Sequence, residues 1–120
     1  MTDSLVLFLP LPPSINSFQR DKRGRPLGNR SSLVQSWIKS ADGYAYGHLK
    51  GAAIKGEYLV RITWSKLQFR KFDVSNRVKA LEDYLERIGV IENDRECWDL
   101  HVNWGDVPTG MCRVEIWPKD

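Results

Sequence analysis

Apolar and polar residues alternate in three stretches of the second half of the chain, and this alternation predicts three β-strands. The alternating apolar positions are Tyr58, Val60, Ile62 and Trp64 in the first stretch, Trp98, Leu100, Val102 and Trp104 in the second, and Cys112, Val114 and Ile116 in the third. The segment GDVPTG joins the last two stretches and predicts a hairpin loop, because it carries the Gly and Pro residues typical of turns. Near the start, the apolar run 4–9 predicts a short buried strand that ends at the proline-rich segment PLPPSIN.

Two other stretches place apolar residues at helical spacing. Residues 33–50, LVQSWIKSADGYAYGHLK, predict a helix capped by Ser31 or Ser32. The apolar stripe of a second predicted helix contains Val74, Val78, Leu81, Leu85 and Ile88. Gly89 follows this stripe as a stop signal, and Asp73 precedes it where an N-cap residue belongs.

The predicted order is strand, loop, helix, strand, helix and two strands, which gives an α+β fold with helices packed on a largely antiparallel mixed sheet. The 120 residues suffice for one modest core, so residues 1–120 are expected to form a single domain. No apolar run approaches the roughly 20 residues of a membrane span, and MTDSLVLFLPLPPS lacks the basic start of a signal peptide. Cys97 and Cys112 lack zinc-ligand spacing and are expected to be reduced thiols of a cytoplasmic protein.

Charge is unevenly distributed along the chain, although the net charge is only +3. The basic run 20–30 contains one acid and the bases Arg20, Lys22, Arg23, Arg25 and Arg30. A second basic stretch ends with Arg70 and Lys71, and acids outnumber bases from Glu82 to Asp106. A basic surface beside an acidic pocket suits a phosphodiester substrate and a divalent metal ion. Charge runs are also common on ordinary solvated surfaces, and either run alone fits that interpretation equally well.

The polar side of the second predicted helix fits two interpretations. Lys79 and Asp83 stand four residues apart, so an ordinary capped helix with an ion pair explains them. Together with Asp73 before the helix and Asp94 after the short VIEN connection, the same face also fits the metal-binding half of a nuclease site. The second interpretation requires the chain to double back beside the helix, which the sequence permits.

Two segments resemble the RusA family of Holliday-junction resolvases, small endonucleases of bacteria and their prophages. LPLPPSINSF is similar to the family's LP-x-PPS-x-N opening, and FDVSNRVKALEDYLERIGVIENDRECWDLHV resembles its D-x-D-N-x-x-K…D-x-L…G…D-D core. A basic loop and a helix lie between them, and the resemblance covers nearly the whole chain. It implies a RusA-like domain over residues 1–120 that cleaves four-way DNA junctions with the help of Mg²⁺.

The resemblance also implies roles for individual positions. Asp73 matches the family's first essential aspartate, Lys79 its catalytic lysine, and Asp94 the aspartate beyond the helix, so these three are the implied catalytic residues. Mg²⁺ is the implied cofactor, with Mn²⁺ as the alternative ion. The implied metal ligands are Asp73, Asp83 and Asp94, and the implied supporting residues are Ser75 and Asn76.

Ser75 departs from the family's pattern because it stands where the family has its second core aspartate. The serine hydroxyl is a weak ligand without charge, whereas hard oxygen ligands hold Mg²⁺ partly through their charge. Either Asp83, Glu82 or a water molecule takes this place, or the affinity for metal and the activity both decrease.

The implied function is that of a crossover junction endodeoxyribonuclease in DNA recombination and repair. Because a four-way junction is nearly twofold symmetric and needs two matched cuts, the resemblance implies a homodimer. The expected DNA contacts are Arg20, Lys22, Arg23, Arg25, Arg30, Arg70 and Lys71. Two alternatives stay open: a RusA-like junction-binding protein whose catalysis is impaired by Ser75, and an unrelated small module that binds RNA or DNA. Metal dependence separates the first two, and preference for branched over linear DNA separates both from the third.

Overall fold

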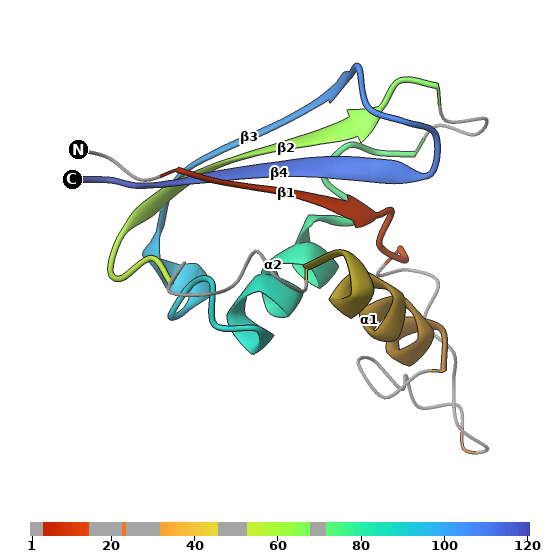
Figure 1. The fold of residues 1–120 in the computed structure, drawn as a ribbon, viewed down its shortest axis with the longest axis horizontal. Coiled ribbons are helices and arrows are strands. Elements are labelled where there is room, and N and C mark those ends of the chain that lie inside the picture. Colours follow the sequence, from red (N-terminus) through yellow and green to blue (C-terminus); the bar gives the residue numbers. More distant parts are fainter. Residues whose placement is uncertain (1–3, 15–22, 24–31, 46–52, 68–71) are drawn as a thin grey trace.

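The computed structural model describes residues 4–14, 23, 32–45, 53–67 and 72–120. Its elements are β1 (Leu5–Pro10), α1 (Ser32–Ala45), β2 (Tyr58–Ser65), α2 (Val78–Arg87), the 3₁₀ helix η3 (Asp94–Glu96), β3 (Cys97–Gly105) and β4 (Met111–Pro118). Figure 1 shows α1 and α2 together on one face of the four-stranded sheet. The predicted α+β fold with helices packed on a mixed sheet is therefore confirmed. In the described residues, no helix is long and apolar enough to cross a membrane.

The strands lie in the order β1-β4-β2-β3, and this order corrects the predicted hairpin. β4 pairs antiparallel with β1 and with β2, whereas β3 pairs parallel with β2. The segment GDVPTG therefore connects β3 to β4 across β2, and the prediction of a hairpin there is wrong. The physical reason lies in α2, which is the crossover that a parallel β2–β3 pair requires. Alternation predicts that a strand exists, but it does not determine which strand lies beside it.

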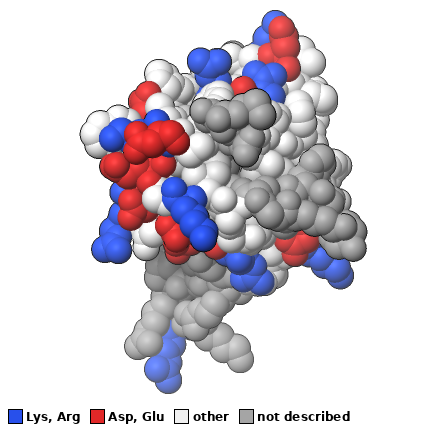
Figure 2. Space-filling view, turned by 60° about the vertical axis from the view of Figure 1, so that its left-hand side comes forward, with Lys and Arg blue, Asp and Glu red and all other residues white. Residues whose placement is uncertain are grey.

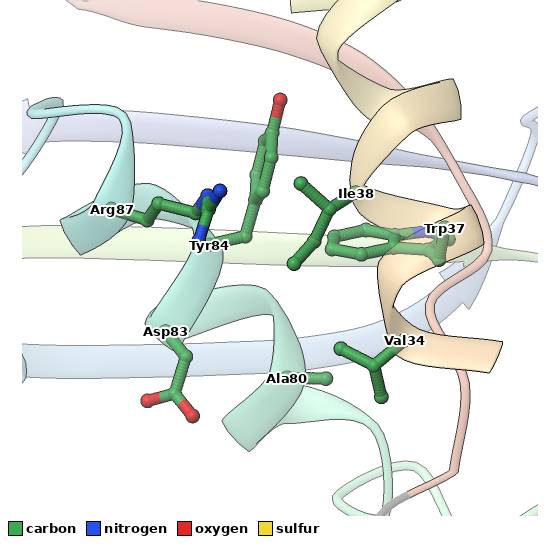
Figure 3. Close-up of a pocket in the computed structure, with 7 residues that line it drawn as sticks. All are labelled: Val34, Trp37, Ile38, Ala80, Asp83, Tyr84 and Arg87. Carbon is green, nitrogen blue, oxygen red and sulfur yellow. The ribbon is translucent and has the colours of Figure 1, made fainter. Parts of the chain in front are cut away.

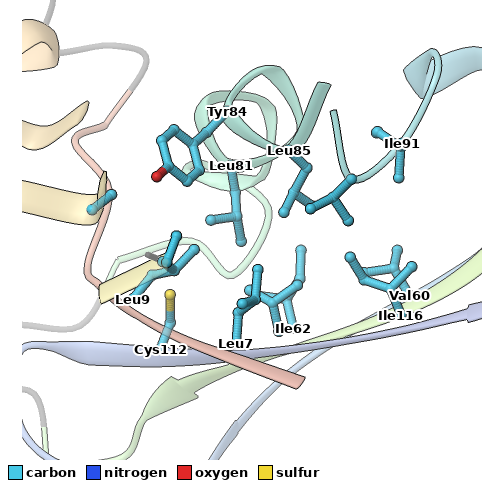
Figure 4. Close-up of a cluster of buried hydrophobic side chains, with 14 of the residues drawn as sticks. Leu7, Leu9, Val60, Ile62, Leu81, Tyr84, Leu85, Ile91, Cys112 and Ile116 are labelled. Carbon is cyan, nitrogen blue, oxygen red and sulfur yellow. The ribbon is translucent and has the colours of Figure 1, made fainter. Parts of the chain in front are cut away.

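The core lies between the helices and the face of the sheet that they cover (Figure 4). The predicted alternation in β2 and β4 is confirmed, because its apolar positions are buried. The side chains that meet there are Leu7 and Leu9 of β1, Val60 and Ile62 of β2, Cys112, Val114 and Ile116 of β4, and Leu81, Tyr84 and Leu85 of α2. This layer fixes the position of α2 against the sheet, and α2 carries most of the candidate site.

Strand β3 is an edge strand, and its alternating apolar residues are less buried than the pattern predicts. Trp98 is 60% exposed and Leu100 is 42% exposed, while Val102 and Trp104 are partly buried against the core. The ammonium of Lys119 lies 3.8 Å from the centre of the Trp98 ring and covers part of it. The strand itself is thus confirmed, but the predicted alternation in burial holds only in the second half of β3, because the helices do not extend over this edge (Figure 1).

Helix α2 starts later than predicted and ends where predicted. It begins at Val78, and its N-cap residue is Arg77, whose side chain forms no capping hydrogen bond. The assignment of Asp73 as the cap is therefore wrong. The reason is that residues 73–78 form successive tight turns, in which the Asn76 amide donates to the Asp73 carbonyl and the Val78 amide to the Ser75 carbonyl. Gly89 has a φ of 80° just after the helix, as a stop residue should.

Two further predictions concern the ends of these helical stretches. Val74 is 37% exposed, so it does not belong to the buried stripe, because it lies in the turns before α2. The predicted first helix is confirmed from Ser32 to Ala45. The remainder of that prediction, Ser31 and residues 46–50, lies outside the described residues.

Candidate active site

The chain reverses direction after α2 and brings Asp94 back beside the helix. The amides of Val90 and Ile91 both donate to the Leu85 carbonyl, which folds the connection against the end of α2. The Asp94 amide then donates to the Glu86 Oε1 at 3.1 Å. The doubling back that the nuclease interpretation requires is therefore present.

Lys79 joins two of the predicted acids. Its Nζ lies 2.7 Å from the Asp94 Oδ2 and 2.9 Å from the Asp83 Oδ1. These hydrogen bonds raise the pKa of Lys79, with the bond to Asp94 contributing most and the bond to Asp83 next. Lys79 is consequently a fixed positive charge at neutral pH. Because the Lys79 side chain is 51% exposed, solvent screens both pairs, and their contribution to stability is small.

Glu82 lies on the same helix and adds a third carboxyl group to this neighbourhood. Burial raises the pKa of Glu82 first, and the negative charge of Asp94 raises it further, while Lys79 acts in the opposite direction. Glu82 is partly buried, in contrast to the exposed Glu86 one turn further along α2. The structure therefore places Glu82, one of the groups considered as a substitute for the missing aspartate, electrostatically close to Asp94.

Tyr58 is a residue that sequence reasoning missed. It is fully buried at the start of β2, and its hydroxyl meets no hydrogen-bonding oxygen or nitrogen among the described residues, although the Cys97 thiol lies beside it. Burial raises the pKa of Tyr58 most, and the neighbouring Cys97, Glu82 and Asp94 raise it further. Its place in the alternating pattern of β2 identified it only as a core side chain, although a buried phenol usually needs a partner.

The turns before α2 carry the remaining predicted site residues. Asp73 and Ser75 are exposed, and Asn76 is partly buried. The Trp64 indole Nε1 donates to the Val74 carbonyl at 2.8 Å and anchors this turn to β2. Across the part of the chain that the structure describes, no hydrogen bond or ion pair joins the Asp73 carboxylate to another side chain.

The structure thus brings together two of the three predicted metal ligands. Asp83 and Asp94 share the ammonium of Lys79, whereas Asp73 makes no such contact. Within the described residues, no three His, Cys, Asp or Glu side chains are grouped closely enough to hold a metal ion. The donor chemistry nevertheless suits Mg²⁺, because carboxylate oxygens are the ligands that it prefers, and a cation already lies between Asp83 and Asp94.

The surface around this site carries charges of both signs. Figure 2 shows Asp and Glu side chains gathered in one area, with Lys and Arg side chains beside them. Of the predicted DNA contacts, Arg23 is described and exposed. The other six, Arg20, Lys22, Arg25, Arg30, Arg70 and Lys71, lie outside the described residues.

A small cleft of about 90 Å³ separates α1 from α2 next to Asp83 (Figure 3). Apolar residues of α1 line one side, and Ala80, Tyr84 and Arg87 line the other. The Tyr84 hydroxyl donates to the Asp42 Oδ1 at 2.8 Å and ties the two helices together. This cleft is too small for a nucleotide. It belongs to the packing of α1 against α2, which holds Asp83 in place.

Comparison with known proteins bears on the family of this chain. No family model matches the chain. The crossover junction endodeoxyribonuclease RusA of Aquifex aeolicus is 36% identical to it over 93 residues, which is 78% of this chain and 71% of that relative.

Proposed function

This chain belongs to the RusA family of crossover junction endodeoxyribonucleases, and from that membership we propose that it cuts Holliday junctions with the help of Mg²⁺. The observation that carries this proposal is the contact of Lys79 with both Asp83 and Asp94. The lysine and the two aspartates come from separate parts of the motif, and the reversal after α2 assembles them at one place.

The proposed reaction is hydrolysis of one DNA phosphodiester in each of two strands. A water oxygen attacks phosphorus, the bond from phosphorus to the leaving oxygen breaks, and that oxygen receives a proton. Mg²⁺ bound by carboxylates supplies activation of the water and stabilisation of the phosphoryl charge. Asp94, Asp83 and Asp73 are the residues that would hold it.

Lys79 supplies a positive charge beside the phosphate. Its ammonium is held on two sides by carboxylates, so it is oriented before the DNA arrives. The first amides of α2 lack helical partners, and the helix N-terminus adds a further positive potential close to Lys79. Together these groups stabilise the charge that develops on the phosphoryl oxygens.

The alternative function is junction binding without efficient cleavage. The observation that favours it is Ser75, an exposed hydroxyl in the turn before α2 where the family has an aspartate. With one carboxylate fewer, the site carries less negative charge with which to hold Mg²⁺.

One experiment separates these functions. A synthetic four-way junction and a linear duplex of the same sequence are incubated with the protein, with and without Mg²⁺ or Mn²⁺. The proposal predicts symmetric cuts in the junction alone, and only with metal. Junction-selective binding without cuts at any metal concentration supports the impaired protein, and equal binding to both DNAs supports an unrelated nucleic-acid-binding module.

A further inference from the structure

A groove of about 410 Å³ lies between the end of β1, the first half of α1 and the residue that precedes α2. Its size falls within the range of roughly 300–1,000 Å³ that is usual for ligand pockets. The residues that line it are Leu11, Pro13, Ser14, Leu33, Ser36, Trp37 and Arg77. The groove thus has mostly apolar walls with two hydroxyls and one guanidinium.

The aromatic wall of the groove is rigid. The Trp37 Nε1 donates to the Pro10 carbonyl at 2.9 Å, and the Trp37 ring packs edge-on against Tyr84 with 4.9 Å between the ring centres. Trp37 itself is only 8% exposed, so the protein covers most of its ring, whereas Leu33 on the same helix is 47% exposed and leaves apolar surface open to a ligand. An exposed apolar side chain beside a firmly held aromatic ring suits packing against a nucleobase.

Arg77 brings a positive charge to the groove without an acidic partner. One of its terminal nitrogens, Nη1, donates to the Pro12 carbonyl at 2.7 Å, and its guanidinium lies 4.2 Å from the centre of the Phe72 ring. The Nε is buried and has no partner among the described residues, and no carboxylate in that part of the chain pairs with Arg77. Because this partly buried guanidinium has no opposite charge beside it in the described residues, the groove is suited to an anionic ligand.

The position of the groove relates it to the active site. Arg77 is two residues before Lys79 and directly precedes α2. Along the chain, the basic run 20–30 lies between Ser14 on one wall and Leu33 on the other. The turn that carries Arg77 and the first turn of α2 that carries Lys79 therefore connect the groove to the candidate active site along the chain.

We propose that this groove binds one unstacked nucleotide of the DNA substrate, with the base against Leu33, next to the largely covered Trp37, and a phosphate oxygen at Arg77. This inference rests on the proposed function, and it adds a place where the protein recognises strand opening near the cut. An extruded base costs least where the duplex is already disturbed, so the groove favours branched over continuous DNA.

A matched pair of variants tests the proposal in the full chain. Ser36 and Ser40 are both exposed on α1, but only Ser36 lines the groove. Ser36→Trp fills the groove, whereas Ser40→Trp adds the same bulk elsewhere on the same helix. Because the added ring occupies the space of the base, Ser36→Trp is expected to weaken junction binding by about fivefold or more, and Ser40→Trp to leave it unchanged.

The junction carries 2-aminopurine at each position next to the crossover in turn, and Ca²⁺ replaces Mg²⁺ during binding. One position is expected to change in fluorescence with the wild type and with Ser40→Trp, and not with Ser36→Trp. Equal fluorescence changes and equal affinities for all three proteins would overturn the proposal, provided that circular dichroism shows the same fold.

A second measurement tests nucleotide binding in the groove independently of whether the protein binds or cleaves junctions. Titration of isotope-labelled protein with the trinucleotide dT3 is expected to shift the NMR signals of the Trp37 indole and the Arg77 Nε–H. Shifts at these two groups without junction cleavage would support nucleotide binding in the groove and contradict the proposed nuclease function. Junction cleavage without these shifts, and with Ser36→Trp as active as the wild type, would support the nuclease function and contradict nucleotide binding in the groove.

Discussion

At the scale of single residues, two buried tyrosine hydroxyls of this protein differ in their surroundings. The Tyr58 hydroxyl has no oxygen or nitrogen hydrogen-bond partner among the described residues, whereas the Tyr84 hydroxyl donates to Asp42. An unsatisfied buried hydroxyl costs about 1–3 kcal/mol, and a satisfied one contributes about 1 kcal/mol.

Tyr58→Phe is therefore expected to leave the free energy of unfolding unchanged or to raise it by up to about 1 kcal/mol. Tyr84→Phe, the matched control, is expected to lower it by about 1 kcal/mol because it breaks the bond to Asp42. Urea denaturation of the three proteins measures both changes. A clear loss of stability in Tyr58→Phe would mean that this hydroxyl is bonded in solution, to a water molecule or to the Cys97 thiol.

Ser75 is expected to limit metal binding, because it stands where the RusA family has an aspartate. Ser75→Asp adds a carboxylate two residues from Asp73, in the exposed turn before α2, where the helix dipole favours negative charge. Without metal the two carboxylates repel each other, and bound Mg²⁺ removes this repulsion. The variant is expected to cleave junctions faster than the wild type, with the greatest gain at low Mg²⁺. If its rate equals or falls below that of the wild type across a Mg²⁺ titration, Ser75 does not occupy the place of a missing ligand.

At the scale of elements, Gly89 controls how the chain returns to bring Asp94 to Lys79. Its φ of 80° lies in the left-handed region, which costs other residues about 1–2 kcal/mol. Gly89→Ala is expected to lower the free energy of unfolding by about that amount and to slow junction cleavage. Gly43→Ala is the control, because Gly43 lies inside α1 with open space around it, and this variant is expected to stabilise the protein by roughly 0.5–1 kcal/mol. Thermal denaturation compares the stability of both variants. An equal loss of stability in the two variants would contradict the requirement for a left-handed backbone conformation at Gly89.

The elements also show how far the sequence alone leads. The alternation of β2 and β4 and the stop at Gly89 were predictable, because burial on one face produces a local pattern. The place of β3 beside β2 was not predictable from alternation, since strand pairing depends on the whole sheet. Asp73 as a cap was a wrong prediction because residues 73–78 form tight turns of their own, which the helical stripe through Val74 concealed.

The candidate site combines predictable and unpredictable contacts. The pair of Lys79 with Asp83 follows from a spacing of four on a helix, but its pair with Asp94 depends on the reversal after α2. Sequence reasoning missed Tyr58 and Arg77, because both are recognisable only by what surrounds them in three dimensions. The sequence alone does not show that the Tyr58 phenol is buried or that the Arg77 guanidinium lacks an acidic partner among the described residues.

At the scale of the whole molecule, the symmetry of a four-way junction sets a requirement on assembly. Two matched cuts need two active sites, and a C2 homodimer provides them. Light scattering after gel filtration is expected to give twice the chain mass of 13.9 kDa. A monomer, both alone and on junction DNA, would contradict the homodimer and would require each junction to be cut by independent molecules.

We propose that Asp94, held beside Lys79, serves metal-dependent cleavage of junction DNA. The most direct test compares wild type and Asp94→Asn for both cleavage and binding of one four-way junction across a Mg²⁺ titration. We expect Asp94→Asn to lose cleavage at every Mg²⁺ concentration, while its junction affinity is kept or increases, because a carboxylate that repels the DNA backbone is gone. Cleavage by Asp94→Asn at the wild-type rate would exclude a catalytic role of Asp94, and a joint loss of folding and binding would leave Asp94 with a structural role alone.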